Sequence, residues 1–199
     1  MKSPFLQEMT GSEPLTIEEE YEMQQTWRTD DDSKYTSLNK PCMEYTQKPQ
    51  AKKYLIYHVE CTFIVLAKPQ PDDDNNVFDS SRMIGDVNFY LNNVYNPHEA
   101  ELEVMIAEDG CSGKGVATEV LQLMMHYAVH DVGVTDLVVR IKESNAASIH
   151  IFEQKFGFTE TERSKAFQEV TLRRTITDEL RAEMKLWVKH ATRVDYVRA

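Results

Sequence analysis

The stretch that decides the fold is residues 101–133, which read ELEVMIAEDGCSGKGVATEVLQLMMHYAVHDVG. Residues 101–106 carry an apolar side chain at every second position, which predicts a strand. Residues 110–115 contain three glycines and predict a polar turn. Residues 116–130 then carry apolar side chains at helical spacing. The predicted order is therefore strand, glycine turn, helix.

The glycine turn before this helix is suited to binding an anion. The first backbone N–H groups of a helix have no acceptor within the helix, and they lie at the positive end of its dipole. Glycines let a ligand approach this backbone closely, so the pattern favours a phosphate or pyrophosphate site. The alternative is that the glycines only allow tight packing of the strand on the helix.

Two common phosphate loops do not match the spacing. A Walker loop requires Ser or Thr after Gly-Lys, but Gly113-Lys114 is followed by Gly115, and Glu108 stands where the first glycine is needed. A dinucleotide fingerprint requires a third glycine at position 118, which is Thr118. Both classes are therefore excluded.

Two motifs together resemble the GNAT acyl-CoA N-acyltransferases. The hexapeptide Ser112-Gly113-Lys114-Gly115-Val116-Ala117 is similar to motif A of that family at its two small positions, but not at its first position. A Val-rich strand candidate at 136–141 leads to Asn145, a helical stretch and a closing Gly157-Phe158, similar to the second signature. The resemblance implies an α/β GNAT fold, with a mixed, mostly antiparallel sheet flanked by helices.

Several further segments resemble the N-acetyltransferase 9 group of that family, the alpha/beta-tubulin N-acetyltransferases. They are residues 12–16, 61–66, 85–88, 103–108 and 167–172. This resemblance implies that residues 33–59 are an insertion and that the first strand of the family is missing. Met1 then corresponds to an internal methionine, as in a splice or gene-model variant.

Composition places the chain in a broad class. Its 199 residues with 41% hydrophobic content predict one domain with a sizeable core. The net charge of -11 argues against nucleic acid as a partner. Three cysteines without a Cys-x-x-Cys pair indicate a reducing compartment, and no apolar run long enough to span a membrane is present. We expect a soluble, cytoplasmic protein, associated with microtubules if the resemblance extends that far.

The remaining pattern predicts further elements. Thr16 and Glu19 form a capping-box signature for a helix at about 17–28. Strands are predicted at 54–66 and 82–91, a hairpin at 159–164 and 167–175, and a tail helix capped by Thr177. We therefore assign residues 1–176 to the GNAT domain and 177–199 to the tail helix.

The resemblance also implies which residues bind acetyl-CoA, without a metal. The family holds the cofactor pyrophosphate on the backbone of the motif A turn, and its pantetheine arm on the backbone of the preceding strand. An N–H of Met105 or Ile106 would polarise the thioester carbonyl, and Asn145 would bind the cofactor arm or a water. The implied set is Met105, Ile106, Ala107, Ser112, Gly113, Lys114, Gly115, Val116, Ala117 and Asn145.

Acetyl transfer to an amine needs a base, and two glutamates are candidates. Glu101 and Glu103 alternate with the apolar residues of their strand, so they project from the opposite face. We prefer Glu103, which is nearer the point where the family's strands separate; the alternative is that both are solvated strand residues. Many relatives carry a tyrosine seven residues after the Asn, which protonates the leaving thiolate, but this chain has Phe152.

The acceptor can be weighed by amine pKa. At a pH of about 7.4, an α-amine of pKa about 7.8 is roughly a quarter neutral, whereas a lysine of pKa about 10.4 is roughly a thousandth neutral. We therefore expect a protein N-terminus as acceptor, which agrees with the resemblance to tubulin acetylation. Two alternatives stay open: a catalytically impaired acyl-CoA-binding or microtubule-associated module, and a transferase acting on small-molecule or side-chain amines.

Overall fold

The computed structural model describes residues 59–67, 82–111 and 113–191, together with Glu8, Thr16, Glu18, Glu19 and Glu22. Most of the predicted helix at 17–28 and almost all of segment 33–59 lie outside the described residues. So do the first part of the predicted strand 54–66, the turn at 69–81 and Ser112. The capping box is confirmed, because the Thr16 N–H donates to Glu19 Oε2 at 2.8 Å and the Glu19 N–H donates to Thr16 Oγ1 at 3.2 Å.

In the described part of the chain, six strands form one mixed sheet in the order β1-β2-β3-β4-β6-β5. Among these strands only the β3–β4 pair is parallel, and the other four pairs are antiparallel. The strands are β1 (Val59–Leu66), β2 (Met83–Leu91), β3 (Glu99–Ile106), β4 (Asp136–Lys142), β5 (Thr159–Ser164) and β6 (Glu169–Thr175). The predicted mixed, mostly antiparallel sheet is confirmed.

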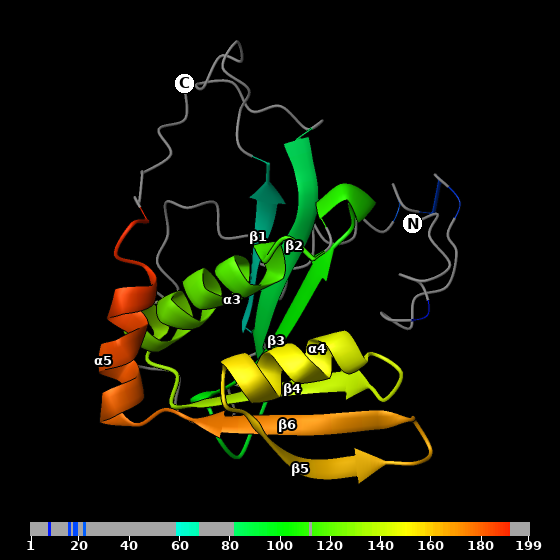
Figure 1. Ribbon diagram of the computed structural model, residues 1–199. Helices are drawn as coiled ribbons and strands as arrows, with labels where there is room; N and C mark the ends of the chain where they lie inside the picture. Colours follow the sequence, from blue (N-terminus) through cyan, green and yellow to red (C-terminus); the bar gives the residue numbers. More distant parts are fainter. Residues whose placement is uncertain are drawn as a thin grey trace.

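The parallel pair separates after only three registered positions. Glu99, Ala100 and Glu101 of β3 pair with residues 136–138 of β4, and no pair follows. Beyond that point β3 continues to Ile106 beside β2, while β4 continues to Lys142 beside β6. In Figure 1 the two halves of the sheet diverge, with β1–β3 running up the page and β4–β6 running across it. The predicted separation of these strands is confirmed.

Helices cover one face of the sheet. Helix α3 (Val116–Tyr127) continues as a π-helical turn, η4 (Ala128–Val132), and α4 (Ala146–His150) continues as η5 (Ile151–Lys155). In Figure 1, α3 lies in front of β1–β3 and α4 in front of β4–β6, with α5 (Asp178–Trp187) at one side. A short 3₁₀ turn, η3 (Asp109–Cys111), joins β3 to the glycine turn.

The core lies between these helices and the sheet. One cluster combines side chains from both halves of the sheet with side chains from α3 and α5, including Phe89, Leu121, Leu137, Leu172 and Met184. Burying a side chain of this size stabilises the fold by about 1.5–3 kcal/mol before entropy is counted. Glu99, Glu101 and Glu103 of β3 alternate with the core residues Ala100 and Leu102, so they lie on the opposite face, with the candidate bases among them.

The tail helix α5 begins where the sequence predicts. Thr177 has an extended backbone, and its hydroxyl accepts a hydrogen bond from the Leu180 N–H at 3.2 Å. Leu180 and Met184 then enter the same core as the sheet residues. The helix is therefore packed on the domain that precedes it.

Candidate functional site

The glycine turn and the first turn of α3 form an open N-terminus. Gly113 and Gly115 have φ of +71° and +82°, a left-handed conformation that glycine adopts at little cost. Gly115 is the N-cap residue of α3, so no side chain caps the first N–H groups. The Glu119 N–H is bonded to the Gly115 carbonyl at 3.1 Å. The N–H groups of Val116 and Ala117 precede that first helical bond and have no acceptor within α3.

The glycine turn can be an anion-binding site, or it can only allow tight packing of the strand on the helix. The surroundings of its glycines distinguish these two interpretations. A Cβ added to Gly110, Gly113 or Gly115 meets no described heavy atom within 4 Å. Gly113, Lys114 and Gly115 are all exposed. The glycines therefore do not serve tight packing against the described residues, and the turn is accessible to a ligand. Ser112, the remaining predicted residue of this turn, lies outside the described residues.

The open edge of β3 offers backbone groups next to this turn. The Ala107 N–H donates to the Ile84 carbonyl of β2 at 2.8 Å. Residues alternate in direction along an antiparallel ladder, so the Met105 N–H also faces β2, whereas the N–H groups of Val104 and Ile106 face the side of β4. Of the two N–H groups expected to polarise the thioester carbonyl, that of Met105 thus faces β2 and that of Ile106 faces the side of β4.

A β-bulge fixes the end of β3. The β1–β2 register shifts opposite Val65 and Leu66, where Ile84 is the extra residue of β2. Its carbonyl accepts from the N–H groups of both Ala107 and Glu108, at 2.8 and 3.4 Å. The neighbouring Gly85 has no side chain, and a Cβ there would lie 2.1 Å from the Met105 carbonyl oxygen. β2 and β3 therefore approach more closely at this point than a side chain would allow.

Glu103 lies two residues beyond Glu101, which is the last residue of β3 that pairs with β4. It is on the polar face of the sheet. Its carboxylate accepts a hydrogen bond from the Tyr90 hydroxyl at 3.3 Å. Partial burial raises the pKa of Glu103, and the charges of Glu101, Asp86 and Glu60 raise it further, against the lowering effect of the Tyr90 hydrogen bond. A raised pKa makes this carboxylate a better proton acceptor.

Glu101 is held differently, although it lies on the same face of the same strand. It forms an ion pair with Arg140 of β4, and its side chain is only 14% exposed. The Asn92 side-chain N–H also donates to the same carboxylate at 3.5 Å. Arg140 lies two residues after Val138, which is the last residue of β4 that pairs with β3. The ion pair therefore joins the two strands where they separate. The structure thus distinguishes the two candidate bases.

Two predicted positions on α4 and η5 also have structural roles. Asn145 is the N-cap of α4, and its side-chain oxygen accepts from the Ser148 N–H at 3.1 Å. Phe152 is 3% exposed and packs edge-on against Phe158, with the ring centroids 5.1 Å apart. The residue at the tyrosine position of the family is therefore part of the apolar core.

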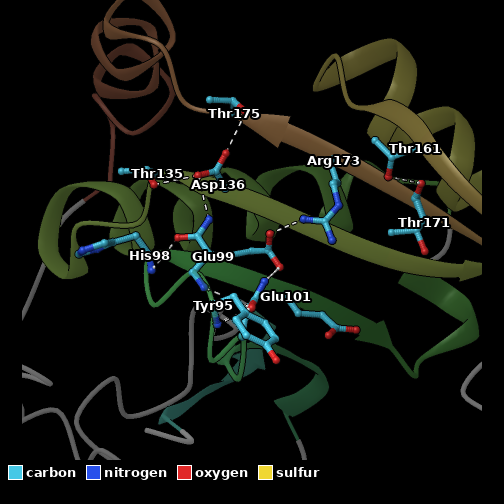
Figure 2. Close-up of polar contacts among 12 residues, drawn as sticks. Tyr95, His98, Glu99, Glu101, Thr135, Asp136, Thr161, Thr171, Arg173 and Thr175 are labelled. Atoms are coloured by element: carbon cyan, nitrogen blue, oxygen red, sulfur yellow. Dashed lines mark hydrogen bonds and ion pairs between the residues drawn. The ribbon is translucent and has the colours of Figure 1, made fainter. Parts of the chain in front are cut away.

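A polar network closes the other end of the β3–β4 pair. Figure 2 shows Asp136 between Thr135 and Thr175, and Glu99 facing Arg173. Asp136 accepts hydrogen bonds at 2.8–3.3 Å from Thr175, Thr135 and Asn96. The Glu99 carboxylate forms an ion pair with Arg173 and accepts from Asn93 at 2.7 Å. These contacts hold the strands together at the point from which they diverge.

Sequence reasoning missed Tyr90, Arg140 and Ile84. Each lies on a different strand from the residue it contacts, so only the register between strands brings them together. Within the described part of the chain, no group of three or more metal-ligating side chains is placed to hold an ion. No described helix has the length and apolar character needed to cross a membrane.

The divided sheet, with an open helix N-terminus after the strand that separates, defines the class of GNAT acetyltransferase folds. The sequence matches the GNAT acetyltransferase domain family over residues 9–159. The chain belongs to this family, and it is of the N-acetyltransferase class.

Relatives and a solved structure agree with this assignment. The chain is 38% identical to human alpha/beta-tubulin-N-acetyltransferase 9, over 89% of this chain and 72% of that protein. It is 36% identical to an N-acetyltransferase 9-like protein of Nematostella vectensis, over 87% and 73% of the two chains. A domain from Methanocaldococcus jannaschii shares the fold, with a TM-score of 0.56 at 20% identity, covering 87% of this chain and 86% of that one.

Proposed function

We propose that this protein transfers an acetyl group from acetyl-CoA to a protein amine, and that the acceptor is the N-terminal α-amine of tubulin. The observation that carries the proposal is the separation of β3 from β4 after Glu101. It brings an open strand edge, an open helix N-terminus and a glutamate of raised pKa to one region of the fold.

The described residues fit acetyl-CoA. The N–H groups of Val116 and Ala117, with the adjacent exposed Lys114, suit a pyrophosphate in a molecule of net charge -11. The unpaired edge of β3 suits the amide groups of a pantetheine arm, with the Ile106 N–H directed toward β4. When bound, the cofactor supplies an acetyl thioester, whose thiol leaving group has a pKa of about 8.5.

Glu103 supports the proton transfer that the reaction requires. The acceptor nitrogen loses one proton when its bond to the acetyl carbon forms, and the Glu103 carboxylate takes that proton directly or through water. An N–H of Ile106 would donate to the developing negative charge on the carbonyl oxygen. With Phe152 in the core, no side chain at the family's tyrosine position donates a proton, and solvent supplies the one needed by the leaving thiol.

The acceptor proposal rests on chemistry and on the relatives. A single glutamate is a modest base, so it favours an α-amine, which is partly neutral near neutral pH, over a lysine side chain. Human and Drosophila relatives, at 38% and 36% identity, carry the name alpha/beta-tubulin-N-acetyltransferase 9. A tubulin acceptor would place the protein in the cytoplasm, in contact with tubulin or microtubules.

One observation favours a second candidate function. Phe152 replaces the residue that protonates the leaving thiolate in many relatives, and its ring is buried against Phe158. A protein without this acid that retains the cofactor site would be a catalytically impaired acyl-CoA-binding module. A measurement of acetyl transfer distinguishes such a binding module from an active enzyme.

The test combines calorimetric titration of the 199-residue protein with acetyl-CoA and mass spectrometry of a tubulin N-terminal peptide. We expect micromolar binding and a mass gain of one acetyl group on the α-amine. Gly115→Ala should weaken binding at least tenfold, because a side chain at a φ of +82° strains the backbone and alters the first N–H groups of α3.

Gly133→Ala is the matched control. Gly133 follows η4, has a φ of +87° and has no described heavy atom within 4 Å of an added Cβ, so its strain is similar but lies at the other end of the helix. We expect it to lower stability by about 1–2 kcal/mol while acetyl-CoA binds normally. Binding without transfer would favour the module without activity, and absence of binding by the folded protein would contradict both functions.

A further inference from the structure

Two glutamates on one face of β3 differ in the kind of donor that holds them. Glu101 forms an ion pair with Arg140. Glu103 accepts a hydrogen bond from a neutral phenol, that of Tyr90. The Glu101 carboxylate is therefore held by a positive charge, whereas the Glu103 carboxylate is held by a neutral hydroxyl group.

The register of the sheet places Tyr90 between glutamates. Tyr90 lies directly opposite Glu60 of β1 on one side and Glu101 of β3 on the other. Its hydroxyl does not donate to either of these direct neighbours in the contacts observed, and instead reaches diagonally to Glu103 at 3.3 Å. Diagonal neighbours on adjacent strands are within reach of an aromatic side chain. Arg140 and Asn92 both bind Oε2 of Glu101, so that carboxylate already has two donors of its own.

We propose that Tyr90 is a positioning residue for acetyl transfer, whose hydroxyl holds the Glu103 carboxylate on the polar face where β3 and β4 separate. A glutamate side chain has three rotatable bonds, and holding it in one orientation costs entropy unless a contact fixes it. The phenol has only two, and its ring lies between two neighbouring strands, so it is a rigid donor.

The protonation state of Tyr90 suits this role. Burial raises the pKa of Tyr90, and the negative charges of Glu103, Glu60 and Asp86 raise it further. The phenol therefore stays protonated through the pH range in which acetyl transfer is measured, and it acts only as a donor toward Glu103. Tyr90 thus adds no negative charge next to Glu103.

Several charged groups set the affinity of Glu103 for a proton. Glu60 on β1, Asp86 on β2 and Glu101 on β3 face the same side, and each raises the pKa of Glu103. Burial raises the pKa of Asp86 itself, against a hydrogen bond from Asn88. Arg140 on β4 faces Glu101 and forms an ion pair with it. The Tyr90 hydrogen bond works against these effects, so its removal must raise the pKa of Glu103.

This inference rests on the proposed function, but one of its tests does not require activity. We would titrate Glu103 by carbon NMR of carboxyl-labelled protein, assigning its signal by its loss in Glu103→Gln. In Tyr90→Phe we expect the pKa of Glu103 to rise by about half a unit or more. An unchanged pKa would overturn the inference whether or not the protein is active.

The kinetic arm measures acetyl transfer to the tubulin peptide from about pH 5 to pH 9. In Tyr90→Phe the acidic limb of kcat/KM should move to higher pH and kcat should fall about tenfold, with the KM for acetyl-CoA unchanged. Tyr95→Phe is the matched control, since Tyr95 is 99% exposed in the β2–β3 turn, and its profile should overlie that of the native protein. Overlying profiles for Tyr90→Phe would overturn the inference, and absence of transfer by the native protein would contradict the proposed function instead.

Discussion

A carboxylate on a strand becomes a base or a structural ion according to the residue on the next strand. Glu101 and Glu103 are two positions apart and point to the same face, but Glu101 is the less exposed of the two. Their partners also differ: a guanidinium from β4 for one and a phenol from β2 for the other. The chemistry of each glutamate is therefore decided by the register of the sheet.

Exchanging each glutamate for glutamine tests this distinction. Glu103→Gln should lower kcat/KM about 10²- to 10⁴-fold and remove the acidic limb of its pH profile, because the proton acceptor is gone. Glu101→Gln should keep most of the transfer rate and lose at most about 1 kcal/mol of stability with its partly exposed ion pair. The measurements are the pH dependence of peptide acetylation and thermal melting. Similar losses of activity in both variants would contradict the assignment of Glu103 as the base.

Single residues of the candidate site were predictable only where the sequence pattern that points to them lies within one continuous segment. The alternation in 101–106 and the glycines of the turn made Glu103 and Gly115 candidates, because periodicity and backbone conformation are local properties. Tyr90 and Arg140 were not predictable, since nothing in the sequence states which residues face each other across strands. The choice between the Met105 and Ile106 N–H groups stayed open for the same reason, as only the ladder with β2 assigns their direction.

At the scale of elements, caps and ends follow from identifiable side chains. The α5 cap is the simplest case, since the Thr177 hydroxyl satisfies one N–H at the start of a helix whose Leu180 and Met184 complete the core. The Asn145 cap of α4 is similar, and it gives that residue a structural role in addition to its proposed one.

Removing the hydroxyl of Thr177 should destabilise the whole domain. We expect Thr177→Ala to lower the free energy of unfolding by about 1 kcal/mol, because the Leu180 N–H loses its acceptor. Thr177→Ser keeps the hydroxyl and should remain close to the native value. Denaturant unfolding of the two variants measures the difference, and equal stability of the alanine and serine variants would show that the cap contributes nothing.

Most element boundaries were predictable to within a few residues. The hairpin at 159–175, the strand at 136–142 and the start of α5 agree with the expected ranges. Strand β3 begins two residues before the predicted start, at Glu99, because its first pairs are with β4. The π-helical turns η4 and η5 were not predictable, since their side-chain pattern is that of an ordinary helix and only the backbone hydrogen bonds distinguish them.

For the whole molecule, the closed end of the β3–β4 pair holds the two halves of the sheet together. The polar network of Asp136 and Glu99 lies on one face there, while the shared core covers the other (Figure 2). The mixed, mostly antiparallel character of the sheet came from the family resemblance and not from periodicity, which does not identify neighbouring strands. The register, and hence the place where pairing stops, needed the structure.

Asp136 should make this end of the sheet sensitive to acid. Burial disfavours its charged form, but hydrogen bonds from Thr175, Thr135 and Asn96, with the charge of Arg173, outweigh burial and lower its pKa below the usual 3.8. The stability that Asp136 contributes is therefore fully present above about pH 4 and is lost as the pH falls through the lowered pKa. Asp136→Asn should destabilise the protein by about 1 kcal/mol near neutral pH, because the amide replaces one acceptor oxygen by a donor.

The measurement is the melting temperature of both proteins between pH 3 and pH 7. The difference in melting temperature between the native protein and Asp136→Asn should become smaller toward pH 3. The control is Glu162→Gln, at an exposed position of β5 outside the network, which should melt like the native protein at every pH. A difference that stays constant with pH would show that the charge of Asp136 is not what stabilises the sheet.

β2 and β3 lie so close together at Gly85 that a side chain there would displace β3 at the candidate site. A methyl group at Gly85 would lie 2.1 Å from the Met105 carbonyl oxygen, where ordinary contacts need about 3.4 Å, so β3 would have to shift by more than about 1 Å. A displacement of this size at reacting groups can cost about a hundredfold in rate. The contact proposed between the Ile106 N–H and the acetyl carbonyl thus depends on the absence of a Cβ atom at Gly85 of the neighbouring strand.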